Sequence, residues 1–312
     1  MAITAAMVKE LRELTGAGMM DCKKALNETN GDMNEAVEFL RKNGQAKAEK
    51  KAGRIAAEGV VAATVSEDGK VAAIVEVNSE TDFVAKNETF QAYVADVVNQ
   101  AANTSATTIE EFLAEAWALD TSKTVEDELK SQIATIGENM NIRRFEKVVS
   151  EDGIVVSYIH QGGKIGVLVE AQTNSTSDDV KECLKNVAMQ VAAMNPKYTS
   201  RDEVDQEYLA KEEEILRAQI MNDPKESAKP EKVIEGMIKG RINKELKEVC
   251  LLDQAYVKAE DGKQTVGAYV EAVAKAAGCD LKVKKFVRFE TGEGIEKKQE
   301  DFAAEVAAQM GQ

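Results

Sequence analysis

An internal repeat constrains the fold of this chain more than any other feature of its sequence. Shifting the sequence by 94 residues, the separation of Gly59 and Gly153, aligns two stretches of similar pattern. Each copy predicts a strand, a turn, a second strand and a helix that packs on a small antiparallel sheet, so the fold class is α+β. The shift pairs Gly69-Lys70-Val71 with Gly163-Lys164-Ile165, Ile74-Val75-Glu76 with Leu168-Val169-Glu170, and the helix positions Phe90, Val94 and Val97 with Leu184, Ala188 and Val191.

The two copies differ in their loops. Thr81-Asp82-Phe83 of the first copy falls opposite Ser175-Thr176-Ser177 of the second, and His160 falls opposite Ser66, in the predicted hairpin turn. Because the scaffolds are similar and the loops are not, the two units offer different side chains from similar positions. One binding surface can use both.

The stretch from Asn78 to Val84 connects a predicted buried strand to a predicted helix. Two interpretations are open for it. In the first, Thr81 or Asp82 caps a helix and Phe83 enters the local core. In the second, Phe83 is exposed beside the carboxylate on a rigidly held connection, which is typical of a binding site. Spacing alone favours the first interpretation.

The remaining chain changes composition along its length, and we expect several further units. The helical ones are three short N-terminal helices with a basic connector, and a charged segment of sparse apolar residues that predicts an antiparallel helical hairpin. The hairpin interrupts the second repeat, because strand-like sequence resumes beyond it. The expected units are 1–55, helical with connector; 56–150, first core unit; 151–200 with 251–291, second core unit; 201–250, hairpin; and 292–312, a C-terminal module whose helix carries Phe302, Val306 and Met310.

Within these units the spacing makes several specific predictions. Leu11 and Leu14 fall on one buried face of the first helix, and Trp117 is a core residue of a helical segment between the repeats. Ser200 with Glu203 has the spacing of a capping box and predicts the start of a helix. The apolar stripe of the hairpin either pairs within the hairpin or recruits a second copy into a homodimer, and both alternatives stay open.

Charge and cysteine usage restrict the classes of function. The 55 acidic side chains outnumber the 40 basic ones and give a net charge of −15, which argues against a nucleic-acid binder that depends on phosphate neutralisation. No secretion signal or apolar stretch of membrane-spanning length is present, so we expect a cytoplasmic protein without membrane contact. Its four cysteines are scattered, which predicts free buried thiols rather than disulfides or a zinc site.

Catalytic motifs are not found. With one histidine and no nucleophile elbow, phosphate-binding loop or zinc-protease motif, an enzyme would have to be built from Glu80, Asp82 and His160. We therefore expect no catalytic residues, no metal and no cofactor. A second alternative is an adaptor of the ubiquitin-associated type, whose coiled coil scaffolds other proteins without contacting a nucleotide.

Several strings, in order along the whole chain, resemble the family of bacterial translation elongation factors Ts. These factors promote guanine-nucleotide exchange on elongation factor Tu. The strings are TGAGMMDCKKAL at 15–26, TDFVAK at 81–86, IGENMNIRR at 136–144, GVLV at 166–169, EGIEK at 293–297 and DFAAEVA at 301–307.

The resemblance implies an N-terminal module like a ubiquitin-associated domain, a two-part core, an inserted coiled coil and a C-terminal module that docks on the partner. The implied partner is elongation factor Tu, either GDP-bound or nucleotide-free, and the implied role is to displace Mg²⁺ and release GDP so that GTP can bind. Asp82 and Phe83 would intrude near the partner's magnesium site, with Thr81 and Val84 completing that motif. His160 would make a second contact. The further implied contacts are Met19, Met20, Lys23, Ile136 and Gly137.

Overall fold

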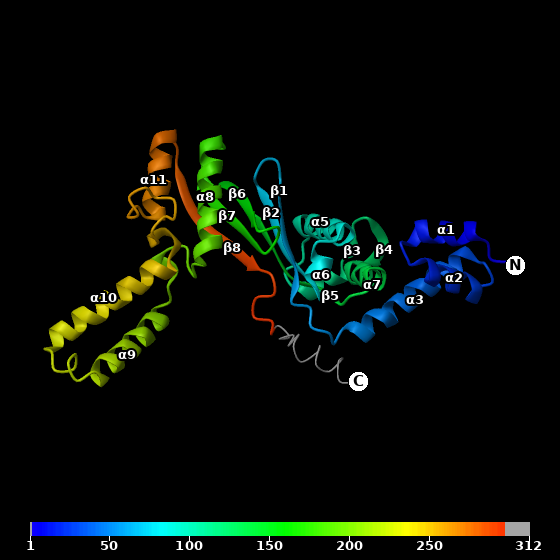
Figure 1. The fold of residues 1–312 in the computed structure, drawn as a ribbon. Helices are drawn as coiled ribbons and strands as arrows, with labels where there is room; N and C mark the ends of the chain where they lie inside the picture. The colour runs from blue at the N-terminus through cyan, green and yellow to red at the C-terminus, as the bar shows by residue number, and fades with distance from the viewer. Residues whose placement is uncertain (1, 297–312) are drawn as a thin grey trace.

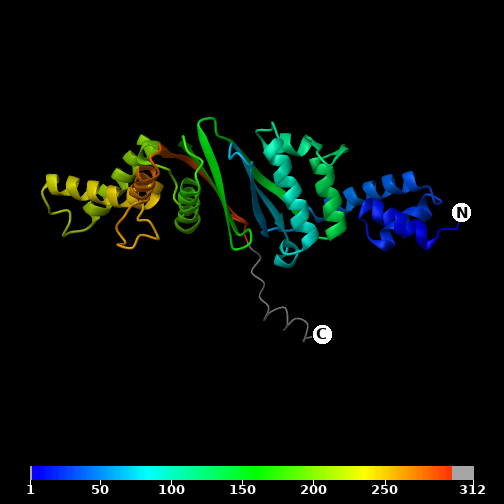
Figure 2. The ribbon, with the colours of Figure 1, turned by 90° about the horizontal axis from the view of Figure 1, so that it is seen from above.

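The computed structural model describes residues 2–296 of an elongated α+β molecule (Figure 1). Three N-terminal helices form one end, a helical hairpin forms the other, and two small antiparallel sheets lie between them, as the view from above also shows (Figure 2). The predicted C-terminal helix with Phe302, Val306 and Met310 lies outside the described residues. Within the described part of the chain, no helix is long and apolar enough to cross a membrane.

The N-terminal helices are α1 (Ala5–Thr15), α2 (Met19–Glu28) and α3 (Met33–Lys51), so α3 continues through most of the predicted basic connector. They enclose a small core that includes Leu11. The prediction for Leu14 was wrong, because this side chain is 67% exposed. Ala17, from the loop after the helix, contacts the core cluster at this end instead.

The central sheets repeat the same topology. The first contains β1 (Glu58–Val65), β2 (Val71–Ser79) and β5 (Met140–Val149) in the order β1-β2-β5. The second contains β6 (Gly153–His160), β7 (Ile165–Thr173) and β8 (Leu281–Glu290) in the order β6-β7-β8. Both middle strands carry a register shift, after Glu76 in β2 and after Glu170 in β7. These positions are again 94 residues apart, so the repeat seen in the sequence extends to the strand pairing.

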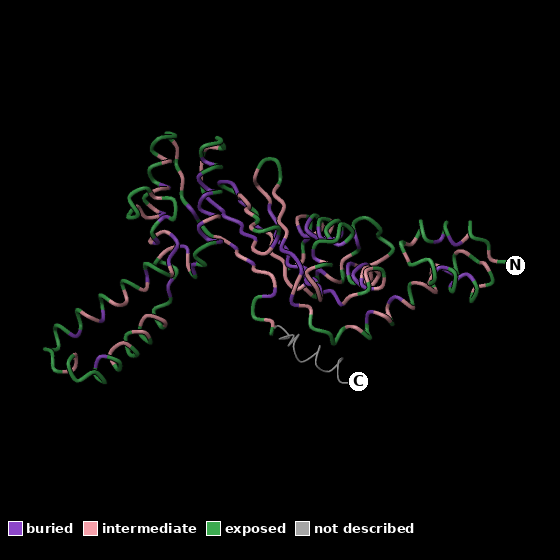
Figure 3. Tube along the Cα trace, in the orientation of Figure 1, coloured by how far each residue is buried: buried purple, intermediate pink, exposed green. Residues whose placement is uncertain are grey.

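Helices cover the outer faces of the two sheets. The first sheet packs against α5 (Glu88–Asn103), which belongs to a cluster with α6 (Ile109–Ala114) and α7 (Val125–Ile136). The second sheet packs against α8 (Asp178–Met194), which contacts α11 (Val266–Ala277). The inner faces meet in a separate apolar cluster containing Val61, Ile74, Val148, Val155, Leu168 and Val287. Burial is therefore concentrated in the strands and the helices beside them (Figure 3).

The segment around Trp117 differs from its prediction. Trp117 is buried, as expected, but it belongs to the strand β3 (Ala116–Trp117), which pairs with β4 (Asp120–Thr124) rather than continuing a helix. The helix before it stops because Glu115 is extended, and the Thr104 hydroxyl donates to the Glu115 carboxylate at 2.6 Å.

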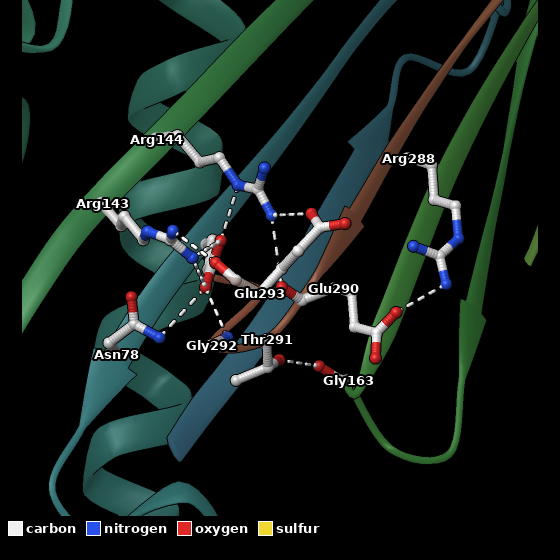
Figure 4. A network of polar contacts seen from close by, with 10 residues as sticks. Asn78, Arg143, Arg144, Gly163, Arg288, Glu290, Thr291, Gly292 and Glu293 are labelled. Atoms are coloured by element: carbon white, nitrogen blue, oxygen red, sulfur yellow. Dashed lines mark hydrogen bonds and ion pairs between the residues drawn. The ribbon is translucent and has the colours of Figure 1, made fainter. Parts of the chain in front are cut away.

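A buried ion cluster ties the first sheet to the chain that leaves the second (Figure 4). Glu76 in β2 is completely buried and accepts hydrogen bonds from Arg143 Nη1 at 3.1 Å, Arg144 Nε at 2.6 Å and the Gly292 N–H at 2.8 Å. The Arg144 guanidinium also lies 4.3 Å from the ring centre of Phe289. Because four partners satisfy this carboxylate, counting the Asn78 amide, the cluster fixes how the two halves of the core sit together.

The helical hairpin consists of α9 (Gln206–Asn222) and α10 (Glu231–Val249), which run antiparallel and pack through Ile220, Ile234 and Ile238. Its start differs from the prediction: Ser200 caps only a short 3-10 turn, η1 (Arg201–Glu203), and Asp205 caps α9. Glu203 instead accepts the Thr199 N–H at 2.7 Å, which closes the turn before the helix. A second 3-10 turn, η2 (Leu251–Asp253), follows the hairpin.

Candidate functional site

The connection after β2 forms a single helical turn, α4 (Asp82–Ala85), that presents Phe83 to solvent. Thr81 caps this turn, because its hydroxyl accepts the Val84 N–H at 3.3 Å. Phe83 is nevertheless 83% exposed, which excludes the interpretation favoured by spacing alone, in which this ring enters the local core, and agrees with the interpretation of an exposed aromatic. The structure therefore combines the cap of one interpretation with the exposed aromatic of the other.

A second loop holds this turn in place. The Glu138 carboxylate accepts the Thr81 hydroxyl at 2.7 Å with one oxygen and the Thr81 N–H at 3.0 Å with the other. In the opposite direction, Glu80 accepts the Asn139 N–H at 2.5 Å, and the Asn139 amide donates to the Arg54 carbonyl at 2.7 Å. We call this set of Arg54, Glu80, Thr81, Glu138 and Asn139 the loop clasp.

The loop clasp brings two of the predicted site segments together. Gly137 ends α7 in the left-handed conformation, with φ of +93°, and Glu138 follows it directly. Ile136 and Gly137 are therefore held next to the turn that carries Phe83. Sequence reasoning did not assign a role to the clasp residues Glu138 and Asn139, although both fall in the string at 136–144 that carried the family resemblance.

Asp82 is held in its ionised form. Lys86 Nζ lies 2.6 Å from its carboxylate, one helical turn further along the chain. The hydrogen bond from Lys86 is the main cause of the lowered pKa of Asp82; burial acts in the opposite direction, and the charges of Lys86 and Lys164 add to the lowering. The turn therefore presents an aromatic ring beside a fixed negative charge.

His160 lies at the end of β6 and not in the turn itself, which corrects its predicted place. The turn that follows packs on the first sheet, where the Gly163 carbonyl accepts the Val61 N–H at 2.7 Å. Lys164, in the same turn, pairs with Glu58 at 2.6 Å and also influences Asp82. The loop of the second repeat is therefore anchored on β1, the strand that also contacts α4.

The N-terminal candidates lie elsewhere. Met19 and Met20 are 60% and 73% exposed on α2, and Lys23 is exposed on the same helix. They make no described contact with the turn at Phe83. Their connection to it is indirect, because α3 packs on α7 and Arg41 pairs with Asp127 at 2.8 Å.

Neither metal-binding groups nor disulfides occur among residues 2–296. No three His, Cys, Asp or Glu side chains in this range are arranged to hold a metal ion. Cys22, Cys183 and Cys250 are buried free thiols as predicted, and Cys279 is half-buried.

Comparison with known proteins gives one consistent family. The family model described as Elongation factor TS matches residues 80–293, which include the turn at Phe83, the loop clasp residues 80, 81, 138 and 139, and His160. Elongation factor Ts of Clostridioides difficile (strain 630) is 56% identical over 308 residues, and that of Clostridium perfringens (strain SM101 / Type A) is 55% identical over 309 residues. Each alignment covers 99% of both chains. This chain therefore belongs to the elongation factor Ts family.

Proposed function

We propose that this protein is a guanine-nucleotide exchange factor that acts on elongation factor Tu in the cytoplasm during translation elongation. The observation that carries the proposal is Phe83, an aromatic side chain that is 83% exposed on a turn fixed by hydrogen bonds from a second loop. Exposed aromatic residues of this kind are the usual energetic centres of protein interfaces. The family supplies the identity of the partner.

The mechanism requires no bond-making groups. A GTPase holds its nucleotide through a phosphate-binding loop and a magnesium ion that bridges the phosphates. In our proposal the Phe83 ring enters a pocket on the partner, and the Asp82 carboxylate perturbs the metal's surroundings so that Mg²⁺ is displaced. Because binding is reciprocal, the factor and the nucleotide weaken each other by the same ratio. GDP then leaves and GTP can bind.

Rigidity makes the turn suitable for this task. A side chain that enters a partner must lose conformational freedom, and a surface already ordered before binding loses less. The loop clasp orders the backbone on both sides of Phe83, through Thr81 at the start of the turn and through Glu80 before it. The ionised Asp82 is similarly restrained by Lys86.

The remaining predicted residues fit additional contacts. We propose that Ile136, Gly137 and His160 extend the surface around Phe83, because the loop clasp holds the loop after α7 against α4 and the β6–β7 turn packs on β1, which also contacts α4. Met19, Met20 and Lys23 would form a separate contact on the N-terminal helices, and Val84 completes the turn.

Release of a fluorescent GDP from elongation factor Tu tests the proposal directly. Phe83→Ala should reduce the release rate about 30-fold or more, the effect of losing an interface residue worth ~2 kcal/mol. Its free energy of unfolding should change by less than about 0.5 kcal/mol, because the ring packs on little of its own protein. Leu119→Ala is the matched control, since Leu119 is 70% exposed on the turn between β3 and β4.

Two results separate the proposal from its alternatives. A folded Phe83→Ala protein that releases GDP at the unaltered rate would contradict the role of this ring. An adaptor would bind elongation factor Tu without accelerating release, and that outcome would contradict exchange activity altogether.

A further inference from the structure

Tyr158 and His160 point to the same side of β6, because alternate residues of a strand share a face. The Tyr158 Oη and His160 Nδ1 atoms are 2.9 Å apart, and the two ring centres are separated by 5.8 Å. His160 is the single histidine of the chain. Within residues 2–296, Tyr158 is the hydrogen-bond partner found for its ring, and Nε2 has none.

The two rings are anchored differently. Tyr158 packs against the apolar cluster between the second sheet and its helices, which fixes the position of its hydroxyl group. His160 belongs to no apolar cluster and occupies the last position of its strand, where it pairs with Ile165. The histidine therefore receives its orientation from the tyrosine, and not the reverse.

A neutral imidazole donates from one nitrogen and accepts with the other, and a neighbouring hydrogen bond selects between the two tautomers. A tyrosine hydroxyl can donate or accept, but within residues 2–296 the Tyr158 hydroxyl has no other acceptor than His160 Nδ1, and as the donor to Nδ1 it leaves the proton on Nε2. We infer that Tyr158 is a positioning residue that presents His160 to the partner as an Nε2–H donor. This inference rests on the proposed function and adds the chemistry of the contact: the partner atom facing Nε2 is an oxygen acceptor, either a carboxylate or a backbone carbonyl.

Removing the hydroxyl group should affect the contact by a predictable amount. Without it, the ring of His160 can rotate and both tautomers become populated, so only part of the population presents Nε2–H toward the partner. A hydrogen bond of typical net strength corresponds to about a three- to ten-fold change in an equilibrium. We expect Tyr158→Phe to weaken exchange activity within that range.

Nitrogen-15 NMR of the imidazole gives a direct readout, because a single histidine produces a single set of ring signals. At a pH where the ring is neutral, the unaltered protein should show the Nε2–H tautomer, and Tyr158→Phe should show a mixture. Tyr208→Phe is the control, since the Tyr208 hydroxyl contacts Glu245 in the helical hairpin. Identical tautomer populations in Tyr158→Phe and the unaltered protein would overturn the inference.

The exchange assay supplies the second arm. Tyr158→Phe should slow GDP release in the unaltered background and have no additional effect in a His160→Ala background, because the tyrosine acts through the histidine. An equal effect in both backgrounds would show a general structural role and overturn the inference. If no form of the protein accelerates release, the proposed function fails, while the NMR measurement still decides whether Tyr158 sets the tautomer.

Discussion

Replacing Glu138 with alanine removes the carboxylate that holds Thr81 through both its N–H and its hydroxyl group. Hydrogen bonds to charged groups contribute about 1.5–3 kcal/mol each when well buried and less when exposed. Glu138 is half-buried, so we assign about 1 kcal/mol to each bond and about 2 kcal/mol to the pair. That energy corresponds to about a 30-fold shift toward conformations in which the turn has left the loop clasp.

The affected step should be the encounter with the partner. A factor whose binding-competent conformation is only partly populated binds with an apparent affinity reduced by that fraction. Glu138→Ala should therefore slow GDP release about 3- to 10-fold at low factor concentration and recover at saturation. Phe83→Ala should differ, because it removes the ring itself and lowers the rate at saturation as well.

Hydrogen exchange at the Thr81 amide measures the loop clasp independently of the partner. Protection of this amide should fall about 3- to 10-fold in Glu138→Ala, because a 30-fold shift that also lowers the competent population 3- to 10-fold leaves a factor of that size for protection. In Glu138→Gln, which keeps one acceptor oxygen, the protection of the Thr81 amide should lie between that of Glu138→Ala and that of the unaltered protein. Glu67→Ala, at an exposed position of the β1–β2 turn, should behave as the unaltered protein. Unchanged protection of the Thr81 amide in Glu138→Ala, together with an unaltered rate of GDP release at low factor concentration, would refute the reasoning.

Two further substitutions test the ion pairs that hold the units around the site together. Glu76→Ala leaves Arg143 and Arg144 without their buried partner and should lower the free energy of unfolding by about 3–5 kcal/mol in urea; a loss below about 1 kcal/mol would show that the cluster is not needed. Burial by itself raises the pKa of Asp127, but the Thr124 N–H and the charge of Arg41 outweigh it and place the pKa below the ordinary 3.8. The ionised Asp127 carboxylate therefore stabilises the folded protein fully at pH values above 3.8, and this stabilisation is lost as the pH falls through the lowered pKa. An acid titration monitored by hydrogen exchange in α3 should show this loss of stability, and Asp127→Asn should abolish its dependence on pH.

Sequence reasoning predicted the parts of this fold that depend on periodic pattern. The 94-residue repeat located both hairpins and the helices that follow them, because alternation and helical spacing report which faces are buried. The shared register shifts after Glu76 and Glu170 were not foreseen. A register shift depends on how two strands pair, and the sequence of one strand contains only half of that information.

The errors and omissions have a common physical origin. Leu14 has the correct helical spacing for burial, but whether a residue in the last turn is covered depends on where the next loop passes. Thr81 and Glu138 are 57 residues apart, so no local pattern reports their contact. The string at 136–144 indicated that this loop matters, and only the three-dimensional structure shows that Glu138 acts by holding the turn at Phe83.

Comparison of the two repeats shows how one scaffold acquired an exposed turn. In the second repeat, Ser177 caps α8, which starts at Asp178 and runs without a break. The position equivalent to Asp178 in the first repeat is Val84, yet α5 starts only at Glu88, with Asn87 as its cap. The helix start is therefore delayed by about one turn. Val84 and Ala85, the first two of the released residues, form α4 together with Asp82 and Phe83 before them.

The cap at Asn87 should consequently matter for function in a way that its counterpart does not. Asn87 accepts the N–H groups of Thr89 at 2.8 Å and Phe90 at 3.3 Å, and Ser177 accepts that of Val180 at 3.4 Å. Asn87→Ala and Ser177→Ala should each cost about 1 kcal/mol of stability in urea. Only Asn87→Ala should also slow GDP release, because losing the break lets α5 extend toward its N-terminus and carries Phe83 out of its presented position. Equal release rates in the two variants would show that the delayed helix start does not create the binding turn.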